Sequence, residues 1–244
     1  KMMLKKTTVK KLKGLSDEYK DVMSVMEGNA QKSIDDDGRA YGGFIRTVKG
    51  KLQEKITQSL VEIAWGSELN LDMNRLAINS NKIRIPIKPA YLSKIKSIKT
   101  QKEILAKIND YYYGLSVDKH VFIDGKFVIG IECKAYAENA MIKRILVDFM
   151  LLKTKFPELK TYLFQLESML GGDYEQATKE PMGSKQTHSI MSYFDTVDLQ
   201  VLTLIKGARK VNQPINKPEF FKPLEMSALE HGIEMLVDTL KGFK

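Results

Sequence analysis

Three charged side chains and a tight turn lie close together in the middle of the chain. Asp118 stands near the start of one apolar run, an Asp-Gly pair at 124–125 ends that run, and the next apolar run ends in Glu132, Cys133 and Lys134. Two apolar runs on either side of Asp-Gly predict a β-hairpin. Side chains alternate between the two faces of a strand, so Glu132 and Lys134 share one face and Cys133 points to the other. The hairpin therefore predicts two carboxylates and an ammonium group at one end of a sheet.

The register of this hairpin decides whether the two carboxylates meet. A three-residue loop at 124–126 places Asp118 opposite Glu132 and gathers the apolar side chains of both strands on one face. A two-residue turn has the better local propensity, but it pairs Asp118 with Ile131 and mixes polar with apolar side chains on both faces. We expect burial to favour the three-residue loop, with a β-bulge at Gly130 as the alternative way to reach the same pairing.

Two carboxylates at cross-strand distance repel each other unless a cation lies between them. Hard oxygen ligands without paired histidines suit magnesium. A neighbouring lysine can orient or deprotonate a water molecule, or stabilise developing negative charge. This combination suits metal-assisted hydrolysis of a phosphodiester. The competing interpretation is a surface hairpin with solvated charges, which is the usual meaning of an isolated Glu-x-Lys triplet.

The spacing of these residues also resembles a known signature. Asp118 followed by Glu132-Cys133-Lys134 after a hairpin is similar to the Asp…(Asp/Glu)-x-Lys motif of the restriction-endonuclease-like superfamily, with Val117 where a proline often stands. The resemblance implies a Mg²⁺-dependent nuclease in which Asp118 and Glu132 hold the metal. It also implies that the Cys133 carbonyl is a further ligand and that Lys134 orients the attacking water or stabilises the transition state.

A further carboxylate is expected from the helix that precedes the hairpin. Apolar residues recur every four positions over 44–65 and predict a helix there. Nucleases of this superfamily often place a helix before the catalytic hairpin, and the resemblance assigns Glu54 to the metal site. The alternative is a solvated glutamate between Lys51 and Lys55.

Candidate DNA contacts follow the hairpin in two segments. The start of the helix predicted over 135–153 resembles, more loosely, the Asn-Ala-x-x-Arg segment of EcoRI-like endonucleases, with Lys143 where that segment has arginine. A polar loop expected over 171–190 adds further groups that can reach phosphates or bases. The expected DNA-binding residues are Asn139, Lys143, Arg144, Ser184, Lys185, Gln186 and His188.

The order of the predicted elements indicates the fold class. The hairpin, the helix over 135–153 and a strand over 161–167 imply a right-handed crossover, so one parallel strand joins an antiparallel pair. We therefore expect an α/β fold with a mixed central β-sheet flanked by helices, a restriction-endonuclease-like core. A single domain is expected, with a helical N-terminal part over about 1–110, a catalytic core over about 111–170, and a recognition and packing part over 171–244.

The segment before the hairpin is less clearly patterned. Residues 83–89 alternate but contain two prolines, which favours an edge strand or an extended segment whose basic residues face DNA or water. Residues 91–113 predict one helix, continuous or broken. The three tyrosines at 111–113 either stack on bases or, as is more usual before a core strand, pack against the protein.

Composition limits the class of protein. The formal net charge of +9 over 244 residues fits a polyanionic partner, and 43% hydrophobic and 28% charged residues are typical of a globular chain. No apolar run is long enough to cross a membrane and no signal-peptide region is present, so a cytoplasmic protein is expected. The single cysteine excludes an internal disulfide and a cysteine-rich zinc site.

These observations favour a type II restriction endonuclease that uses Mg²⁺ to cut double-stranded DNA at a specific sequence, with a homodimer implied by the resemblance. The alternatives are a repair nuclease, nickase or junction resolvase on the same core, or a DNA-binding protein without catalytic activity. Cleavage of supercoiled plasmid separates these possibilities.

Overall fold

The computed structural model describes residues 2–32, 38–171, 184–210, 212–213 and 220–244, with the side chains of 26–32 and 38–47 outside this description. Its centre is a five-stranded sheet in the order β1-β4-β5-β6-β7. The three strands β1, β4 and β5 pair antiparallel, and β5, β6 and β7 pair parallel, so the predicted mixed sheet is confirmed. The strands are β1 (Leu76–Asn79), β4 (Lys119–Ile123), β5 (Lys126–Ala137), β6 (Lys160–Ser168) and β7 (Leu199–Thr203).

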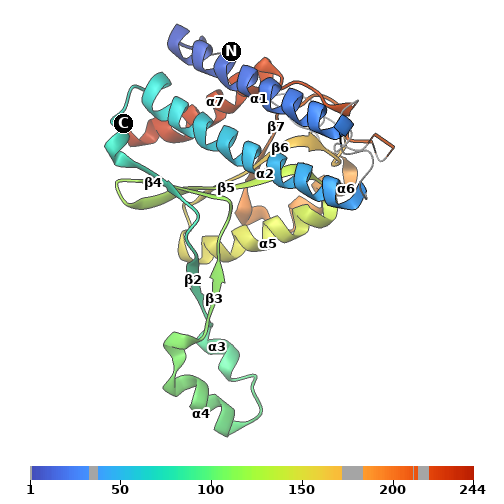
Figure 1. Ribbon diagram of the computed structural model, residues 1–244. Coiled ribbons are helices and arrows are strands. Elements are labelled where there is room, and N and C mark those ends of the chain that lie inside the picture. The colour runs from blue at the N-terminus through green and yellow to red at the C-terminus, as the bar shows by residue number, and fades with distance from the viewer. Residues whose placement is uncertain (1, 33–37, 172–183, 211, 214–219) are drawn as a thin grey trace.

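Helices cover both faces of this sheet (Figure 1). One face carries α1 (Lys6–Lys32), α2 (Gly38–Glu62) and α7 (Met226–Leu240), and the other carries α5 (Asn139–Lys155) with α6 (Lys185–Ser192) beside it. The four-residue spacing that predicted α2 is a buried stripe, because Leu52, Ile56 and Leu60 all lie in the core. Within the described residues, no helix is long and apolar enough to cross a membrane.

The hairpin turn differs from our prediction, which was wrong about the loop. Ile123 pairs with Lys126 across a two-residue turn, in which Asp124 (φ 50°) and Gly125 (φ 77°) are both left-handed. This backbone is the type I′ turn that Asp-Gly favours. Arg75 holds the turn, because its guanidinium donates to both carboxylate oxygens of Asp124 at 2.8–3.2 Å.

A β-bulge then restores the register that burial requires. Val121 pairs with Ile129 but Phe122 pairs with Phe127, so Val128 is the extra residue. It lies two positions before Gly130, where a bulge was the alternative to the expected three-residue loop. Val128 and Ile129 are both buried toward the α2 face, whereas Phe127 is moved to the α5 face. The local turn preference and the global burial preference are thus both satisfied. The extra residue is accommodated in the strand and not in the loop.

Beyond the bulge the pairing is the predicted one, with His120 opposite Gly130 and Lys119 opposite Ile131. Continuing this register by one residue places Asp118, which immediately precedes β4, opposite Glu132. Strand β5 continues to Ala137, so α5 begins at Asn139, four residues later than the predicted helix.

Two segments differ more strongly from the sequence prediction. The helix expected over 91–113 is broken into α3 (Pro89–Leu92) and α4 (Ile98–Ala106), and its last part is the strand β3 (Tyr112–Leu115). This strand pairs with β2 (Ile83–Pro86) in a separate two-stranded ribbon. The loop expected over 171–190 contains α6 from Lys185 onward, while residues 172–183 of it lie outside the described residues.

Candidate active site

Asp118 and Glu132 meet at the end of the hairpin as predicted. Oδ2 of Asp118 accepts a hydrogen bond of 2.7 Å from the main-chain nitrogen of Cys133, which fixes the carboxylate against β5. Glu132 is 8% exposed and lies on the same strand. The two carboxylates therefore come from β5 and from the residue just before β4, two neighbouring strands that the bulge holds in register.

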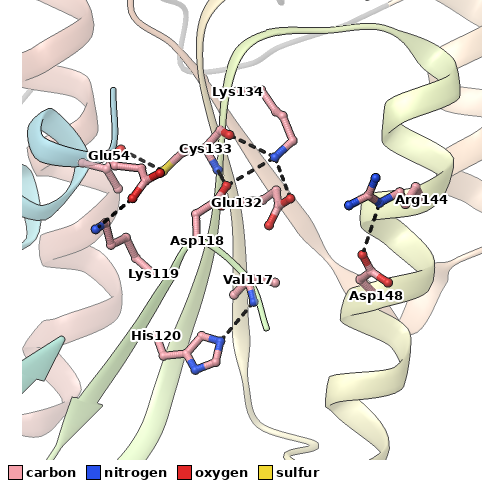
Figure 2. A network of polar contacts seen from close by, with 11 residues as sticks. Glu54, Val117, Asp118, Lys119, His120, Glu132, Cys133, Lys134, Arg144 and Asp148 are labelled. Carbon is pink, nitrogen blue, oxygen red and sulfur yellow. Dashed lines mark hydrogen bonds and ion pairs between the residues drawn. The ribbon is translucent and has the colours of Figure 1, made fainter. Parts of the chain in front are cut away.

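Lys134 joins these carboxylates (Figure 2). Its ammonium nitrogen lies 2.6 Å from Oε1 of Glu132 and 3.3 Å from Oδ2 of Asp118. It also donates to the carbonyl oxygen of Cys133 at 3.0 Å. Three oxygens, two from carboxylates and one from the main chain, thus surround one cationic nitrogen.

This donor set fits a hard divalent cation. Oxygens of carboxylates and a main-chain carbonyl are the ligands that Mg²⁺ takes in proteins, usually with water completing the shell. No group of three or more His, Cys, Asp or Glu side chains suited to a metal occurs among the described residues. The three oxygens that contact the Lys134 ammonium come from two carboxylates and the main-chain carbonyl of Cys133. Of the four expected ligands, Asp118, Glu132 and the carbonyl of Cys133 form a donor set that is consistent with a magnesium site, whereas Glu54 is paired with Lys119 outside it.

The charges of the site perturb one another. Burial raises the pKa of the Glu132 carboxyl, the nearby Asp118 charge raises it further, and Lys134 partly opposes both. Burial alone would lower the pKa of the Lys134 ammonium, but attraction to Glu132 and Asp118 outweighs it and the pKa is raised. Lys134 is therefore a stable cation and a hydrogen-bond donor in this arrangement.

Glu54 lies on the other side of the hairpin from Lys134. Its carboxylate forms an ion pair of 3.3 Å with Lys119 of β4 (Figure 2). The neighbouring thiol of Cys133 is buried and hydrogen-bonds to Thr57 of α2. Burial is the main cause that raises the pKa of this thiol, and the charges of both Asp118 and Glu54 add to it. Glu54 is thus close enough to act on the Cys133 side chain but does not contact Lys134.

His120 was not assigned to the site from the sequence, yet it holds the segment that carries Asp118. Its Nε2 accepts a hydrogen bond of 3.1 Å from the main-chain nitrogen of Val117. The ring is fully buried with its centroid 4.8 Å from that of Phe127, and burial lowers the pKa of the imidazole to about 4. Opposite it, Gly130 leaves no room for a side chain, because a Cβ there would lie 2.9 Å from Phe149.

Asp148 of α5 is a second residue that sequence reasoning missed. It is partly buried, and burial is the main cause that raises the pKa of its carboxyl, while the charges of Arg144 and Lys134 oppose that shift. Nε of Arg144 lies 3.8 Å from Oδ2 of Asp148 (Figure 2). The available signal was the i, i+4 spacing of these two residues, which places them on one helix face.

The predicted DNA-binding residues gather where α5 and α6 begin. Ser184 is the N-cap of α6, and its hydroxyl accepts from the main-chain nitrogen of Thr187. Thr187 donates at 2.8 Å to Oδ1 of Asn139 at the start of α5, and Nδ2 of Asn139 lies 3.4 Å from Oε1 of Gln186. Asn139 therefore joins the start of α5 to α6 through Thr187 and Gln186, while Ser184 caps α6.

The other predicted contacts lie on the solvent side of this junction. The predicted contact residues that are exposed here are Lys143, Arg144, Lys185, Gln186 and His188. A cationic and polar surface thus borders the end of α5 that follows β5.

The mixed central sheet with helices on both faces is consistent with the restriction-endonuclease-like class of nucleases. The chain is 57% identical over 237 residues to the type II restriction enzyme DdeI of Desulfomicrobium norvegicum, an alignment that covers 97% of this chain and 99% of the relative. It therefore belongs to the family of type II restriction enzymes. No protein-family model matches the chain. No solved structure matches it either.

Proposed function

We propose that this restriction endonuclease hydrolyses phosphodiester bonds with Mg²⁺ held by Asp118, Glu132 and the carbonyl of Cys133. The observation that carries the proposal is the convergence of these three oxygens on one cationic nitrogen within 2.6–3.3 Å. Bound Mg²⁺ would supply Lewis-acid activation of a water molecule and neutralise charge on the phosphate.

The protein groups of the site would then have distinct tasks. Glu132 is nearly buried, so its charge acts through a medium of lower dielectric than water and is little screened. Lys134, being cationic, would donate a hydrogen bond that orients the attacking water or stabilises the negative charge on the phosphate oxygens. His120 would hold Asp118 in place through the Val117 nitrogen.

Glu54 is proposed as a secondary group. Its ion pair with Lys119 places it outside the cluster around Lys134, so a direct role would require that ion pair to open. A water-mediated link to the metal is compatible with its position near Cys133. We therefore expect its loss to reduce cleavage less than the loss of Glu132.

Recognition of DNA is assigned to the starts of α5 and α6. Phosphates or base edges would be contacted by the exposed side chains of Lys143, Arg144, Lys185 and His188. The amides of Asn139 and Gln186 hydrogen-bond to each other at the helix junction, and their remaining donors and acceptors would contact the duplex. Ser184 would act mainly as a helix cap.

Two further properties are proposed from the resemblance and from the sequence. A homodimer would match a two-fold symmetric target, because protein and DNA symmetry axes then coincide. A cytoplasmic location is supported by a single cysteine whose thiol is buried. Sedimentation velocity with and without a DNA duplex would test the first of these properties.

The decisive experiment is digestion of supercoiled plasmid in Mg²⁺ and in EDTA, followed by sequencing of the ends. Discrete linear fragments that require Mg²⁺ and share one end sequence would support the proposal. Nicked circles alone, or a mobility shift without cutting, would contradict it. A Glu132→Gln sample prepared in parallel controls for a contaminating nuclease.

A further inference from the structure

Residues 82–115 form an arm that projects from the nuclease core (Figure 1). The ribbon of β2 and β3 leads away from the sheet and carries α3 and α4 at its outer end. At its base the ribbon is anchored to the core, because Ile85 and Leu115 are buried in the same cluster as residues of α5. The arm is therefore a fixed extension with a large exposed surface.

The arm contains most of the excess positive charge of the chain. It has 8 basic and 2 acidic residues, whereas the whole chain has 39 and 30. Subtraction leaves 31 basic and 28 acidic residues for the remaining 210 positions. About two-thirds of the net charge of +9 thus lies in 34 residues, which indicates a local polyanion-binding surface more than a generally basic protein.

The cations of the arm are available for a ligand. Within residues 82–115 the single ion pair is that of Lys99 with Glu103, at 4.0 Å and on the exposed face of α4. The other cations of the arm have no acidic partner among the described residues, and Lys94, Lys96 and Lys102 are exposed at the outer end. Clustered cations without acidic partners repel one another, and an anionic ligand would relieve that repulsion.

Exposed tyrosines accompany these cations. Tyr91, Tyr111, Tyr112 and Tyr113 are 41–57% exposed, although tyrosines before a core strand were expected to pack. Arg84 stacks on the ring of Tyr112 at 4.1 Å and donates to its hydroxyl at 3.3 Å. Hydroxyl donors and guanidinium groups on a two-stranded ribbon are suited to duplex DNA, because such a ribbon fits a groove and its side chains reach phosphates.

A protein partner fits this surface less well. Two arms of net charge +6 would repel each other, which opposes arm-to-arm contact in a dimer. The exposed apolar residues of α4, Ile98 and Leu105, stand among lysines and do not form a continuous patch.

We propose that residues 82–115 are a second DNA-binding element, which holds the sugar–phosphate backbone of the duplex beside the segment that is cut. The proposal rests on the nuclease function above and adds a contact surface away from the catalytic end of the hairpin. Contacts to phosphates carry no base information, so the arm contributes affinity and a requirement for flanking DNA, while sequence discrimination stays with the core.

The test compares two triple variants with matched chemistry. K94Q/K96Q/K102Q removes three arm cations, and K6Q/K10Q/K13Q removes three exposed cations of α1, which covers the opposite face of the sheet from α5. Binding to a random duplex of about 40 base pairs is measured in EDTA between about 50 and 200 mM salt. Each lost phosphate contact lowers the salt slope by about 0.9, so the arm variant should lose about 2.7 from the slope. Between the lowest and the highest salt concentration, the affinity of the wild type should therefore fall by a factor about 40 times larger than that of the arm variant.

The cleavage assay separates failure of the arm from failure of the nuclease function. With a cleavable site placed far from or close to a duplex end, the wild type should cut the internal site faster, and the arm variant should lose this preference while its kcat is retained. Cleavage by the wild type with an unchanged salt slope in the arm variant would overturn the arm proposal alone. The arm proposal would also be overturned if both triple variants lost affinity equally. The same holds if the arm variant changed only in its oligomeric state, measured by sedimentation velocity. Circular dichroism checks that both variants are folded.

Discussion

The ammonium nitrogen of Lys134 lies 2.6 Å from Oε1 of Glu132, two residues earlier on the same strand. Alternation along β5 puts both side chains on the α5 face, and the nearly buried Glu132 turns toward the more exposed lysine. The pair has a consequence for both stability and catalysis. Lys134 is the internal counter-ion of two carboxylates that would otherwise repel each other, and the same oxygens are those assigned to Mg²⁺.

The first prediction concerns the two carboxylates. Asp118→Asn and Glu132→Gln keep the shape of each side chain, and the amide introduced by Asp118→Asn keeps an oxygen that can accept from the Cys133 nitrogen. Cleavage in Mg²⁺ should fall by about 100-fold or more, since a charge that binds the metal is lost. Affinity for duplex DNA in EDTA should be unchanged or higher, because repulsion of phosphate is reduced. Cleavage near the wild-type rate by either variant would refute the site assignment.

The second prediction concerns Lys134. Lys134→Met leaves Glu132 and Asp118 without their shared cation, so the free energy of unfolding in EDTA should fall by up to about 3 kcal/mol. Mg²⁺ should restore part of this loss, giving a larger rise in Tm for the variant than for the wild type. Lys241→Met breaks an exposed ion pair with Asp238 and is the matched control. An equal Mg²⁺-dependent Tm shift in all three proteins would argue against a metal at these oxygens.

The third prediction is a pH dependence caused by His120. The pKa of its imidazole is about 4 in the folded protein, below the ordinary value near 6.5, because the ring is buried. Between these two values the unfolded chain binds more protons, so stability is full above about pH 6.5 and is lost as pH falls toward 4. The contribution is at most about 3 kcal/mol across that window.

His120→Phe should remove this part of the pH dependence of Tm. It should also lower cleavage at neutral pH, since the Val117 nitrogen loses its acceptor and Asp118 is held less firmly. His188→Phe, at an exposed position of α6, serves as the control. A pH profile of Tm that is the same in the wild type and the His120 variant would contradict the role given to burial.

Much of the site could be predicted from sequence because its parts are close together along the chain. The Asp-Gly pair, the apolar alternation and the Glu132–Lys134 spacing all lie within residues 118–134, where local rules are strongest. The position of the bulge at Val128 could not be predicted, because turn propensity and burial conflicted and either the loop or the strand could accommodate the extra residue. Asp148 was missed because its role depends on how α5 sits against the sheet.

The arm was the largest error in the prediction of the fold. Residues 91–113 carry helical spacing, and a break in that helix was one of the expected possibilities. The strand at its end was not expected, because the pairing of Tyr113 with Ile85 is a contact between residues distant along the chain. Tertiary pairing overrode a local helical preference there, as it commonly does for short strands.

The fourth prediction tests the packing behind the hairpin. Gly130→Ala would bring a Cβ within 2.9 Å of Phe149, so the ring or β5 must shift and the free energy of unfolding should fall by about 1–3 kcal/mol. Gly14→Ala is the matched control, because no atom lies within 4 Å of its added Cβ in α1. That substitution should raise stability by about 0.5–1 kcal/mol. Denaturant unfolding of both variants measures the two changes in stability. If the Gly130 variant is as stable as the wild type, the hairpin and α5 pack less tightly than this contact requires.

The last prediction separates base recognition from phosphate contact at α5. Lys143 is exposed and forms no ion pair with a described residue, whereas Arg144 is exposed and lies 3.8 Å from Asp148, whose carboxylate can orient the guanidinium. An oriented, planar guanidinium is better suited to a base edge, and a mobile ammonium group to a phosphate. Arg144→Ala should therefore cost about 1–3 kcal/mol of binding and relax one position of the target, while Lys143→Ala should lower the salt slope by about one and leave specificity intact. Asp148→Asn should produce a weaker form of the Arg144 effect, measured as cleavage of plasmids that carry single-base changes in the target. If the salt slope and the specificity of all three variants equal those of the wild type, the start of α5 does not face the DNA.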